Sequence, residues 1–232
     1  MLEIGAMKEK DIKKLYFRWL LENEPSDTVV VNEFSSTYWD RRADLLVVNG
    51  CIQLVEIKSE YDNLSRLDAQ IEYFLNRGHK VTLIISEKHK DKIKNIPSEV
   101  GIFWIKEGEL ILERSPKRRS VETKLLAEYW RLNELRLLFK GVIKGVYKLH
   151  LDKLQLLFSS LQQEIADKLT CDLLKARYKK HFEEVRKKGE LFIPRVAKRG
   201  LEDPRRDYPE FFKEAKKLLL PYGEQMTFSF AS

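Results

Sequence analysis

The chain has 232 residues, of which 43% are hydrophobic and 11% aromatic, enough for one large or two small domains with a sizeable core. No apolar run approaches the roughly 20 residues that a membrane-spanning helix needs, and the N-terminal segment MLEIGAMKEKDIKK lacks the apolar core of a signal peptide. We therefore expect a soluble, cytoplasmic protein with no membrane partner.

Cysteine and histidine usage argues against a disulfide framework or a zinc site. Cys51 and Cys171 are far apart in the sequence and belong to no metal-spaced pair. The histidines are equally scattered, with no acid or second histidine in a recognisable pattern beside them, so we expect surface or structural roles for His79, His89, His150 and His181.

Charge divides the chain into two unequal halves. Residues 1–115 contain 17 Lys and Arg and 20 Asp and Glu, a net charge of −3, whereas residues 116–232 contain 26 and 16, a net charge of +10. We expect a domain boundary here, at a short basic linker of sequence KRRS. Because Lys and Arg displace counterions from phosphates, the basic half indicates a polyanion-binding surface. Charge alone explains it equally well as the solubility of basic helices.

The first half alternates helices and strands. Apolar residues at helical spacing predict a helix over 8–22, and β-branched runs predict strands. The expected elements in order are a helix over 8–22, strands over 28–34, 45–48 and 52–57, a helix over 64–75, a strand over 80–86, a short helix over 88–95, and a hairpin of 100–105 with 109–113. This order predicts a mixed α/β sheet flanked by helices.

The second half is predicted to be all helical. A helix over 120–140 is interrupted by Gly141 and Gly145, and residues 149–188 form a long helix or a helical pair. Residues 130–158 are compatible with a DNA-binding helix-turn-helix, although a plain packing bundle is the preferred interpretation. A last amphipathic helix spans 209–220, and the final QMTFSFAS is either an added strand or a loose tail.

Three charged residues stand in very apolar strands and need an explanation. Asp44 lies in the first strand of the Asn49-Gly50 hairpin, and Glu56 and Lys58 lie in the second. Ionised carboxylates are costly to bury unless they are paired or coordinate a cation. Glu56 and Lys58 share a face because side chains alternate along a strand, so Asp44 has to reach that face to complete a metal site.

The length of the hairpin loop decides whether Asp44 reaches the correct face. A two-residue loop at Asn49-Gly50 would place Asp44 opposite Val55, on the wrong face. A three-residue loop over 48–50, with Gly50 left-handed as in a G1 bulge, would place it with Glu56. We therefore predict an odd-length turn or a bulge.

The helix after this hairpin carries a row of polar residues beside its apolar stripe. We expect Asp62 or Asn63 to cap its N-terminus, and Arg66 and Gln70 to face phosphate or site water. Tyr73 and Arg77 continue the same row and are interpreted as solvated surface.

Taken together, these residues resemble the PD-(D/E)xK nuclease superfamily. Arg-x-Asp precedes Glu-x-Lys in an apolar strand and a Gln-bearing helix follows, within an αβββαβ order. Glu-x-Lys also occurs at 122–124 and 214–216, but only the first copy has this context, and Ala43 replaces the usual Pro. The segments NEF, RRAD, EIKSEYDNLSRLDAQIEYF and KVTLIIS look like a small family of mostly uncharacterised bacterial and phage nuclease-like proteins. The resemblance covers roughly residues 8–105.

The resemblance implies a restriction-endonuclease-like fold and metal-dependent hydrolysis of DNA phosphodiesters. Asp44, Glu56 and the Ile57 carbonyl would hold one or two Mg²⁺ or Mn²⁺ ions. Lys58 would orient or activate the attacking water, and Gln70 would position water or phosphate.

Further expectations come from the same resemblance. Arg42 and Arg66 would contact the nucleic-acid backbone, and a further catalytic acid would be Glu9, Glu22 or Glu33, of which Glu33 is favoured. Many members of the superfamily cut as dimers, which leaves a homodimer open. The alternative function is a non-catalytic DNA-binding or interaction factor on a retained nuclease fold, and a toxin, defence or anti-defence role on a mobile element is a third hypothesis.

Overall fold

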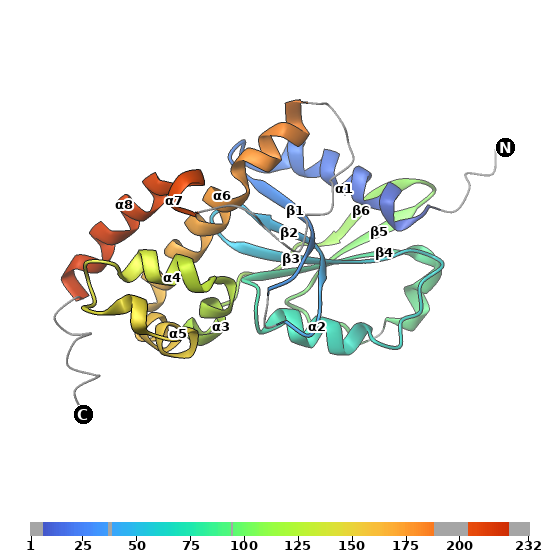
Figure 1. Ribbon diagram of the computed structural model, residues 1–232. Coiled ribbons are helices and arrows are strands. Elements are labelled where there is room, and N and C mark those ends of the chain that lie inside the picture. The colour runs from blue at the N-terminus through green and yellow to red at the C-terminus, as the bar shows by residue number, and fades with distance from the viewer. Residues whose placement is uncertain (1–6, 37–38, 94, 188–203, 223–232) are drawn as a thin grey trace.

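A mixed six-stranded sheet forms the centre of the molecule, in a computed structural model that describes residues 7–36, 39–93, 95–187 and 204–222. The strands lie in the sheet in chain order, with α1 on one face and α2 on the other, as Figure 1 shows. The strands are β1 (Val29–Phe34), β2 (Ala43–Val48), β3 (Ile52–Lys58), β4 (Lys80–Ser86), β5 (Gly101–Lys106) and β6 (Glu109–Arg114). The predicted mixed α/β sheet flanked by helices is therefore confirmed.

Helices make up the rest of the described chain. The α-helices are α1 (Glu9–Asn23), α2 (Leu67–Leu75), α3 (Thr123–Leu126), α4 (Leu132–Phe139), α5 (Leu151–Ser159), α6 (Gln163–Lys187), α7 (Pro204–Asp207) and α8 (Pro209–Leu219). The 3₁₀ turns are η1 (Glu87–Lys92), η2 (Ala127–Tyr129), η3 (Val146–Lys148) and η4 (Leu220–Tyr222). Within the described ranges, no helix combines the length and the apolar character that a bilayer crossing requires.

The strand pairing explains why β4 is so apolar. The pairs β1–β2, β2–β3 and β5–β6 are antiparallel, whereas β4 lies parallel to both β3 and β5. A parallel connection from β3 to β4 needs a crossover, which α2 provides. Residues 81–85 of β4 are buried, as expected for a strand covered on both faces.

Helix α1 is fixed to its face of the sheet by a buried hydrogen-bond network. The Gln53 side-chain amide donates to the Tyr16 hydroxyl and to Thr82 Oγ1, both at 2.9 Å. The Tyr16 ring also meets Phe103 of β5 edge to face. Because Gln53 and Glu56 differ by an odd number of residues in β3, Glu56 lies on the opposite face, toward α2.

The hairpin between β2 and β3 has the odd-length loop that the sequence predicted. Val48 pairs with Ile52, so the loop is 49–51 and not 48–50, with Gly50 at φ +96°. The loop position was one residue off because Val48 extends the ladder to β1 as well as to β3. A register shift of two leaves the face unchanged, and Asp44 lies across from Glu56.

Several local predictions in the first half were wrong. Asp62 and Asn63 do not cap α2, which begins after Arg66; Asp62 accepts hydrogen bonds from Ser59, and Asn63 accepts one from the Ser65 amide. These side chains fold the β3–α2 loop instead. The short helix expected over 88–95 is the 3₁₀ helix η1.

The helix predicted over 120–140 is broken into α3, η2 and α4. Trp130 is extended, with ψ 137°, and its buried indole N–H donates to Thr170 Oγ1 on α6. This tertiary contact overrides the local helical preference. The predicted interruptions at Gly141 and Gly145 are confirmed, with φ of +88° and +74°. Of the two alternatives for the segment after them, the structure has the helical pair, α5 and α6.

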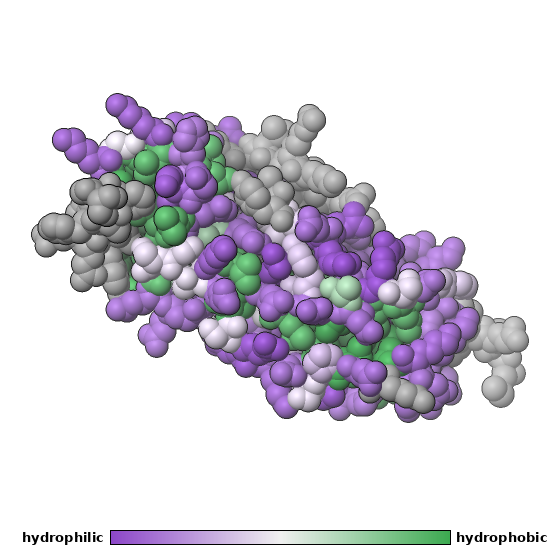
Figure 2. Space-filling view, turned by 90° about the horizontal axis from the view of Figure 1, so that it is seen from below, coloured by the Kyte–Doolittle hydropathy of each residue, from purple (hydrophilic) through white to green (hydrophobic). Residues whose placement is uncertain are grey.

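The hydrophobic core is continuous from the sheet into the helical half. Phe182 of α6 meets Phe17 of α1 edge to face, and Tyr178 of α6 packs against Phe34 of β1 in the same geometry. A separate fold for 116–232 stays a prediction. On the face turned toward the viewer in Figure 2, hydrophobic patches are divided by hydrophilic residues.

Tyr73 and Arg77 are not the solvated surface residues that the sequence suggested. The Arg77 guanidinium lies 3.9 Å from the centre of the Tyr73 ring and pairs with Glu128 at 3.0 Å. The Tyr73 ring in turn meets Trp39. Both side chains therefore tie α2 to the helical half and to the loop after β1.

Candidate metal centre

Glu56 is the best-buried charged residue at this end of the sheet. It is 2% exposed, and its Oε1 accepts hydrogen bonds from Lys58 Nζ at 2.5 Å and from Gln70 Nε2 at 2.6 Å. Its other oxygen, Oε2, is buried and has no hydrogen-bond partner among the residues that the structure describes. Strand β3 supplies Glu56 and Lys58, and the second turn of α2 brings Gln70 over them.

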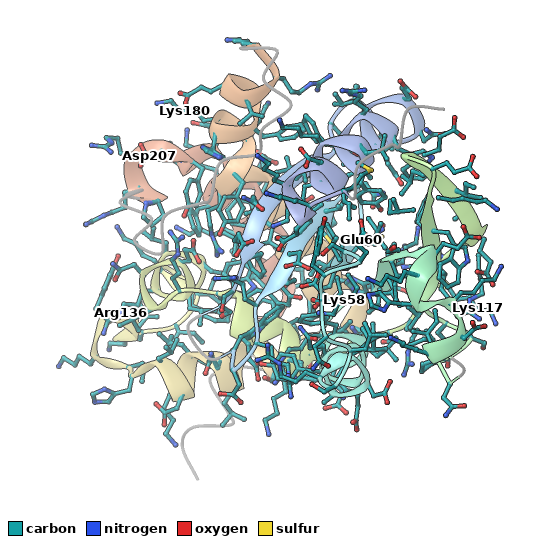
Figure 3. The ribbon with its side chains drawn as sticks, turned by 90° about the vertical axis from the view of Figure 1, so that its right-hand side faces the viewer. Lys58, Glu60, Lys117, Arg136, Lys180 and Asp207 are labelled. Atoms are coloured by element: carbon teal, nitrogen blue, oxygen red, sulfur yellow. The ribbon has the colours of Figure 1, made fainter. Side chains whose placement is uncertain are left out.

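Asp44 joins this group from the neighbouring strand β2. Its Oδ2 accepts a hydrogen bond of 2.7 Å from the amide of Ile57, the residue between Glu56 and Lys58. The predicted convergence of the two acids on one face is thus present. We call Asp44, Glu56, Lys58 and Gln70 the sheet-end cluster. Figure 3 labels Lys58 near the middle of the molecule, beside the strands and α2.

Electrostatics make the charged state of both acids costly. Burial raises the pKa of Asp44 well above its usual value, and repulsion by Glu56 and Glu9 raises it further. Burial also raises the pKa of Glu56, although Lys58 and Gln70 partly oppose this. A cation near both carboxylates would relieve this cost.

Two further acids lie beside Asp44. One carboxylate oxygen each from Glu9, Glu33 and Asp44 lie within 4.8 Å of one another. Glu33 lies across from Asp44 in the β1–β2 ladder and has a left-handed backbone, with φ +55°, which is uncommon for a residue other than glycine. Both Glu9 and Glu33 reach the site, whereas Glu22 is exposed and lies about 20 Å farther along α1 than Glu9.

Lys13 was missed by the sequence analysis. Its ammonium lies 2.6 Å from Glu9 Oε1 and 2.6 Å from Glu33 Oε1, and the residue is only 7% exposed. Burial by itself lowers the pKa of Lys13, but hydrogen bonds to Glu33 and Glu9 outweigh burial and raise it. One sequence feature could have indicated this ion pair: Glu9 and Lys13 are four residues apart on one predicted helix, a spacing that brings two side chains together.

The two predicted phosphate-binding arginines lie in different places. Arg42 pairs with Glu33 Oε2 at 2.5 Å, and its side chain is 42% exposed, so it lies at the rim of the acidic group. Arg66 is exposed just before α2 and makes no side-chain hydrogen bond or ion pair within the described chain. It precedes Gln70 by one helical turn.

A cavity of about 370 Å³ lies where β1 meets the helical half. Its lining begins at Phe34, the residue after Glu33, and includes Trp39 from the following loop. Arg131 and Tyr178 line it from the helical side. The junction between the two halves is therefore hollowed beside the strand that carries Glu33.

These features define a mixed α/β protein with buried carboxylates gathered at one end of its sheet. The chain belongs to the bacteriophage P4 protein cII family, whose family model matches residues 4–191 and therefore includes every site residue described above. It is 30% identical over 189 residues to Protein cII of Enterobacteria phage P4, covering 74% of this chain and 68% of that protein. A solved structure, the SPO1766 protein of unknown function from Silicibacter pomeroyi, matches with a TM-score of 0.39 and 17% identity over 50% of this chain and 76% of that one.

Proposed function

We propose that this protein is a metal-dependent nuclease of the PD-(D/E)xK type, with a restriction-endonuclease-like core, that hydrolyses phosphodiester bonds of DNA. The convergence of Asp44, Glu56, Lys58 and Gln70 at one point carries this proposal. The order of a helix, three antiparallel strands, a crossover helix and a parallel strand supports the core.

The residues fit a Mg²⁺ or Mn²⁺ ion. Glu56 Oε2 is a buried acceptor without a donor, and leaving such a group unsatisfied costs about 1–3 kcal/mol, and more when it is charged. Hard divalent cations prefer carboxylate and carbonyl oxygens. Asp44, Glu56 and the Ile57 carbonyl would hold the ion, which would supply positive charge to stabilise the reacting phosphate.

The remaining residues have separate tasks in hydrolysis. Gln70 holds Glu56 Oε1, so the orientation of that carboxylate is fixed and Oε2 stays available. Lys58 contributes a second positive charge next to Glu56, where it would orient the attacking water and offset charge that develops on the phosphate. Arg42 at the rim and Arg66 would contact neighbouring phosphates.

The basic helical half supports a nucleic-acid substrate. In the connection from α4 to α5 and the first turn of α5, four exposed lysines make no ion pair within the described residues: Lys140, Lys144, Lys148 and Lys153. Tyr147 between them is 53% exposed and would be available to stack on a base. Unpaired lysines beside an exposed aromatic ring are typical of a surface that binds the phosphate backbone.

The direct test is cleavage of plasmid, single-stranded and branched DNA with Mg²⁺ or Mn²⁺. We expect metal-dependent cutting by the wild type and none by Asp44→Asn, a change that keeps an oxygen for the Ile57 amide. The exposed Glu-x-Lys copy at 122–124 offers a matched control, Lys124→Met, which we expect to cut normally. Failure to cut any substrate, or equal cutting by Asp44→Asn, would refute the proposal.

A non-catalytic DNA-binding factor is the second candidate, and the free lysines of the α4–α5 connection favour it. It predicts salt-sensitive DNA binding that Asp44→Asn leaves intact, with no cleavage by the wild type under any metal condition. The nuclease proposal instead predicts binding together with metal-dependent cleavage.

A further inference from the structure

Lys13 has a position that the nuclease proposal does not use. It lies on α1, outside the Glu-x-Lys motif, and its ammonium bridges two acids from different elements, Glu9 and Glu33. Lys13 can therefore determine how many ions the proposed metal centre binds. This inference rests on the proposed function.

Both oxygens of Glu33 and one oxygen of Glu9 already have a cationic partner, whereas Oε2 of Glu56 has no partner in the described structure. Glu33 uses Oε1 for Lys13 and Oε2 for Arg42, at 2.6 and 2.5 Å. Glu9 uses Oε1 for Lys13, at 2.6 Å. Glu56 keeps Oε2 without a partner in the described structure. The chain therefore neutralises Glu9 and Glu33 with its own cations, whereas Glu56 still has an oxygen without a partner.

A divalent ion and the Lys13 ammonium would compete for the same place. Oxygens of Glu9, Glu33 and Asp44 lie within 4.8 Å of one another, close enough to surround one small cation. Magnesium binds oxygens at about 2.0–2.1 Å, so an ion on this set would need a Glu33 oxygen that Lys13 or Arg42 now holds. Two cations within a few ångströms repel strongly, and the burial of Lys13 and Glu33 limits screening by water.

We propose that Lys13 is a built-in cation that fills the second cation position, so that the centre takes one divalent ion, at Asp44 and Glu56, and not two. Lys13 is then a positioning residue: it holds Glu33 in its left-handed conformation and balances Glu9 and Glu33. Its burial keeps the ammonium there, because only 7% of the residue is exposed.

The test is the number of Mn²⁺ ions bound per chain, measured by equilibrium dialysis with detection of free Mn²⁺ by electron paramagnetic resonance. We expect one ion in the wild type and two in Lys13→Ala, which opens the space between Glu9 and Glu33. Lys13→Arg keeps the charge and should bind one, as should the matched control Lys10→Ala on the exposed side of the same helix.

Each other outcome is decisive. Two ions in the wild type, or one ion in a folded Lys13→Ala, overturns the role of Lys13 while leaving the metal centre in place. No ion in the wild type removes the metal centre and the proposed nuclease with it. If Lys13→Ala does not fold, Lys13→Met, which keeps most of the side-chain volume but not the charge, gives the answer: two ions support the proposal, and one ion overturns it.

Discussion

Two of the buried acid–base groups in the described structure, the Glu134–Arg177 pair and the sheet-end cluster, differ in how many of the acid's oxygens accept a hydrogen bond. In the helical half, Glu134 is fully buried and receives donors on both oxygens: Arg177 and Tyr208 on Oε1, and Arg177 and the Arg131 amide on Oε2. In the sheet-end cluster, Glu56 receives both of its donors on Oε1 and none from the described residues on Oε2.

This difference distinguishes an ion pair whose acceptors are all hydrogen-bonded from a cluster that keeps an acceptor oxygen for a ligand. The Glu134 group contains one acid and one guanidinium, and Arg177 also donates to the Tyr129 carbonyl at 2.9 Å. The sheet-end cluster contains two acids that repel each other beside one lysine. Burial of charge is therefore common to both groups, and only the acid of the proposed site is left with an oxygen that no described residue satisfies.

The largest expected effect comes from breaking the satisfied group. Glu134→Gln leaves the Arg177 guanidinium buried without a counter-charge, so we expect the free energy of unfolding to fall by about 3–5 kcal/mol. Urea denaturation measures this. Asp172→Asn removes an exposed pair with Lys168 and serves as the control, with a loss of no more than about 0.5 kcal/mol. A loss as small for Glu134→Gln would show that the two groups do not differ in kind.

Removing the lysine of the sheet-end cluster should change catalysis more than folding. Lys58→Met is expected to reduce the DNA cleavage rate about 10²–10³-fold, the effect of losing one preorganised charge at a reacting group. Its free energy of unfolding should fall by less than that of Glu134→Gln, because Glu56 keeps the Gln70 donor and can take up a proton. Cleavage by Lys58→Met at the wild-type rate would show that Lys58 has no role in the hydrolysis step.

Neutralising an acid of the same cluster should stabilise the metal-free protein. Because burial and repulsion raise the pKa of Asp44, the folded state binds its proton more tightly than the unfolded state. Wild-type stability should therefore fall as pH rises from the unfolded pKa, near 4, through the raised folded pKa. Asp44→Asn removes this dependence and should add about 0.5–2 kcal/mol at pH 7 without metal.

Thermal unfolding with and without Mn²⁺ provides the check on Asp44. The ion should raise the Tm of the wild type but not that of Asp44→Asn. An Asp44→Asn protein that is less stable than the metal-free wild type at pH 7 would mean that Asp44 is a structural residue, as Glu134 is.

The smallest expected effect is on DNA binding by the exposed lysines of the helical half. The buried Glu134 of this half already accepts hydrogen bonds on both oxygens, so only its exposed charges are left to bind DNA. Lys144→Gln with Lys148→Gln should weaken DNA binding and lower the salt dependence of log K by about one unit per lysine. Lys168→Gln, which removes a lysine already paired with Asp172, should change the slope less. Equal salt dependence of log K in the wild type and in both variants would show that DNA does not contact Lys144 and Lys148.

The sequence predicted the elements that depend on local pattern. Strand alternation and the Asn49-Gly50 turn were enough to bring Asp44 and Glu56 to one face, even though the loop was shifted by one residue. The hairpin predicted over 100–105 and 109–113 is present as β5 and β6, and both residues of its turn, Glu107 and Gly108, have positive φ.

The features that the sequence could not supply depend on how elements pack. Glu9 and Lys13 reach the site because the Tyr16–Gln53 hydrogen bond fixes how α1 lies on the sheet, and no local pattern encodes that contact. Trp130 breaks a predicted helix for the same reason, through Thr170 forty residues later. Arg77 looked solvated because its partner, Glu128, lies in the other half of the chain.

The most direct measurement is the anomalous scattering of Mn²⁺ in crystals of the wild-type protein soaked with the metal. We predict one strong peak about 2.0–2.6 Å from Glu56 Oε2 and from an Asp44 oxygen, with Lys13 still between Glu9 and Glu33. Glu56 Oε2 bonded to water or to another protein group, with no peak beside it at saturating Mn²⁺, would contradict the metal centre.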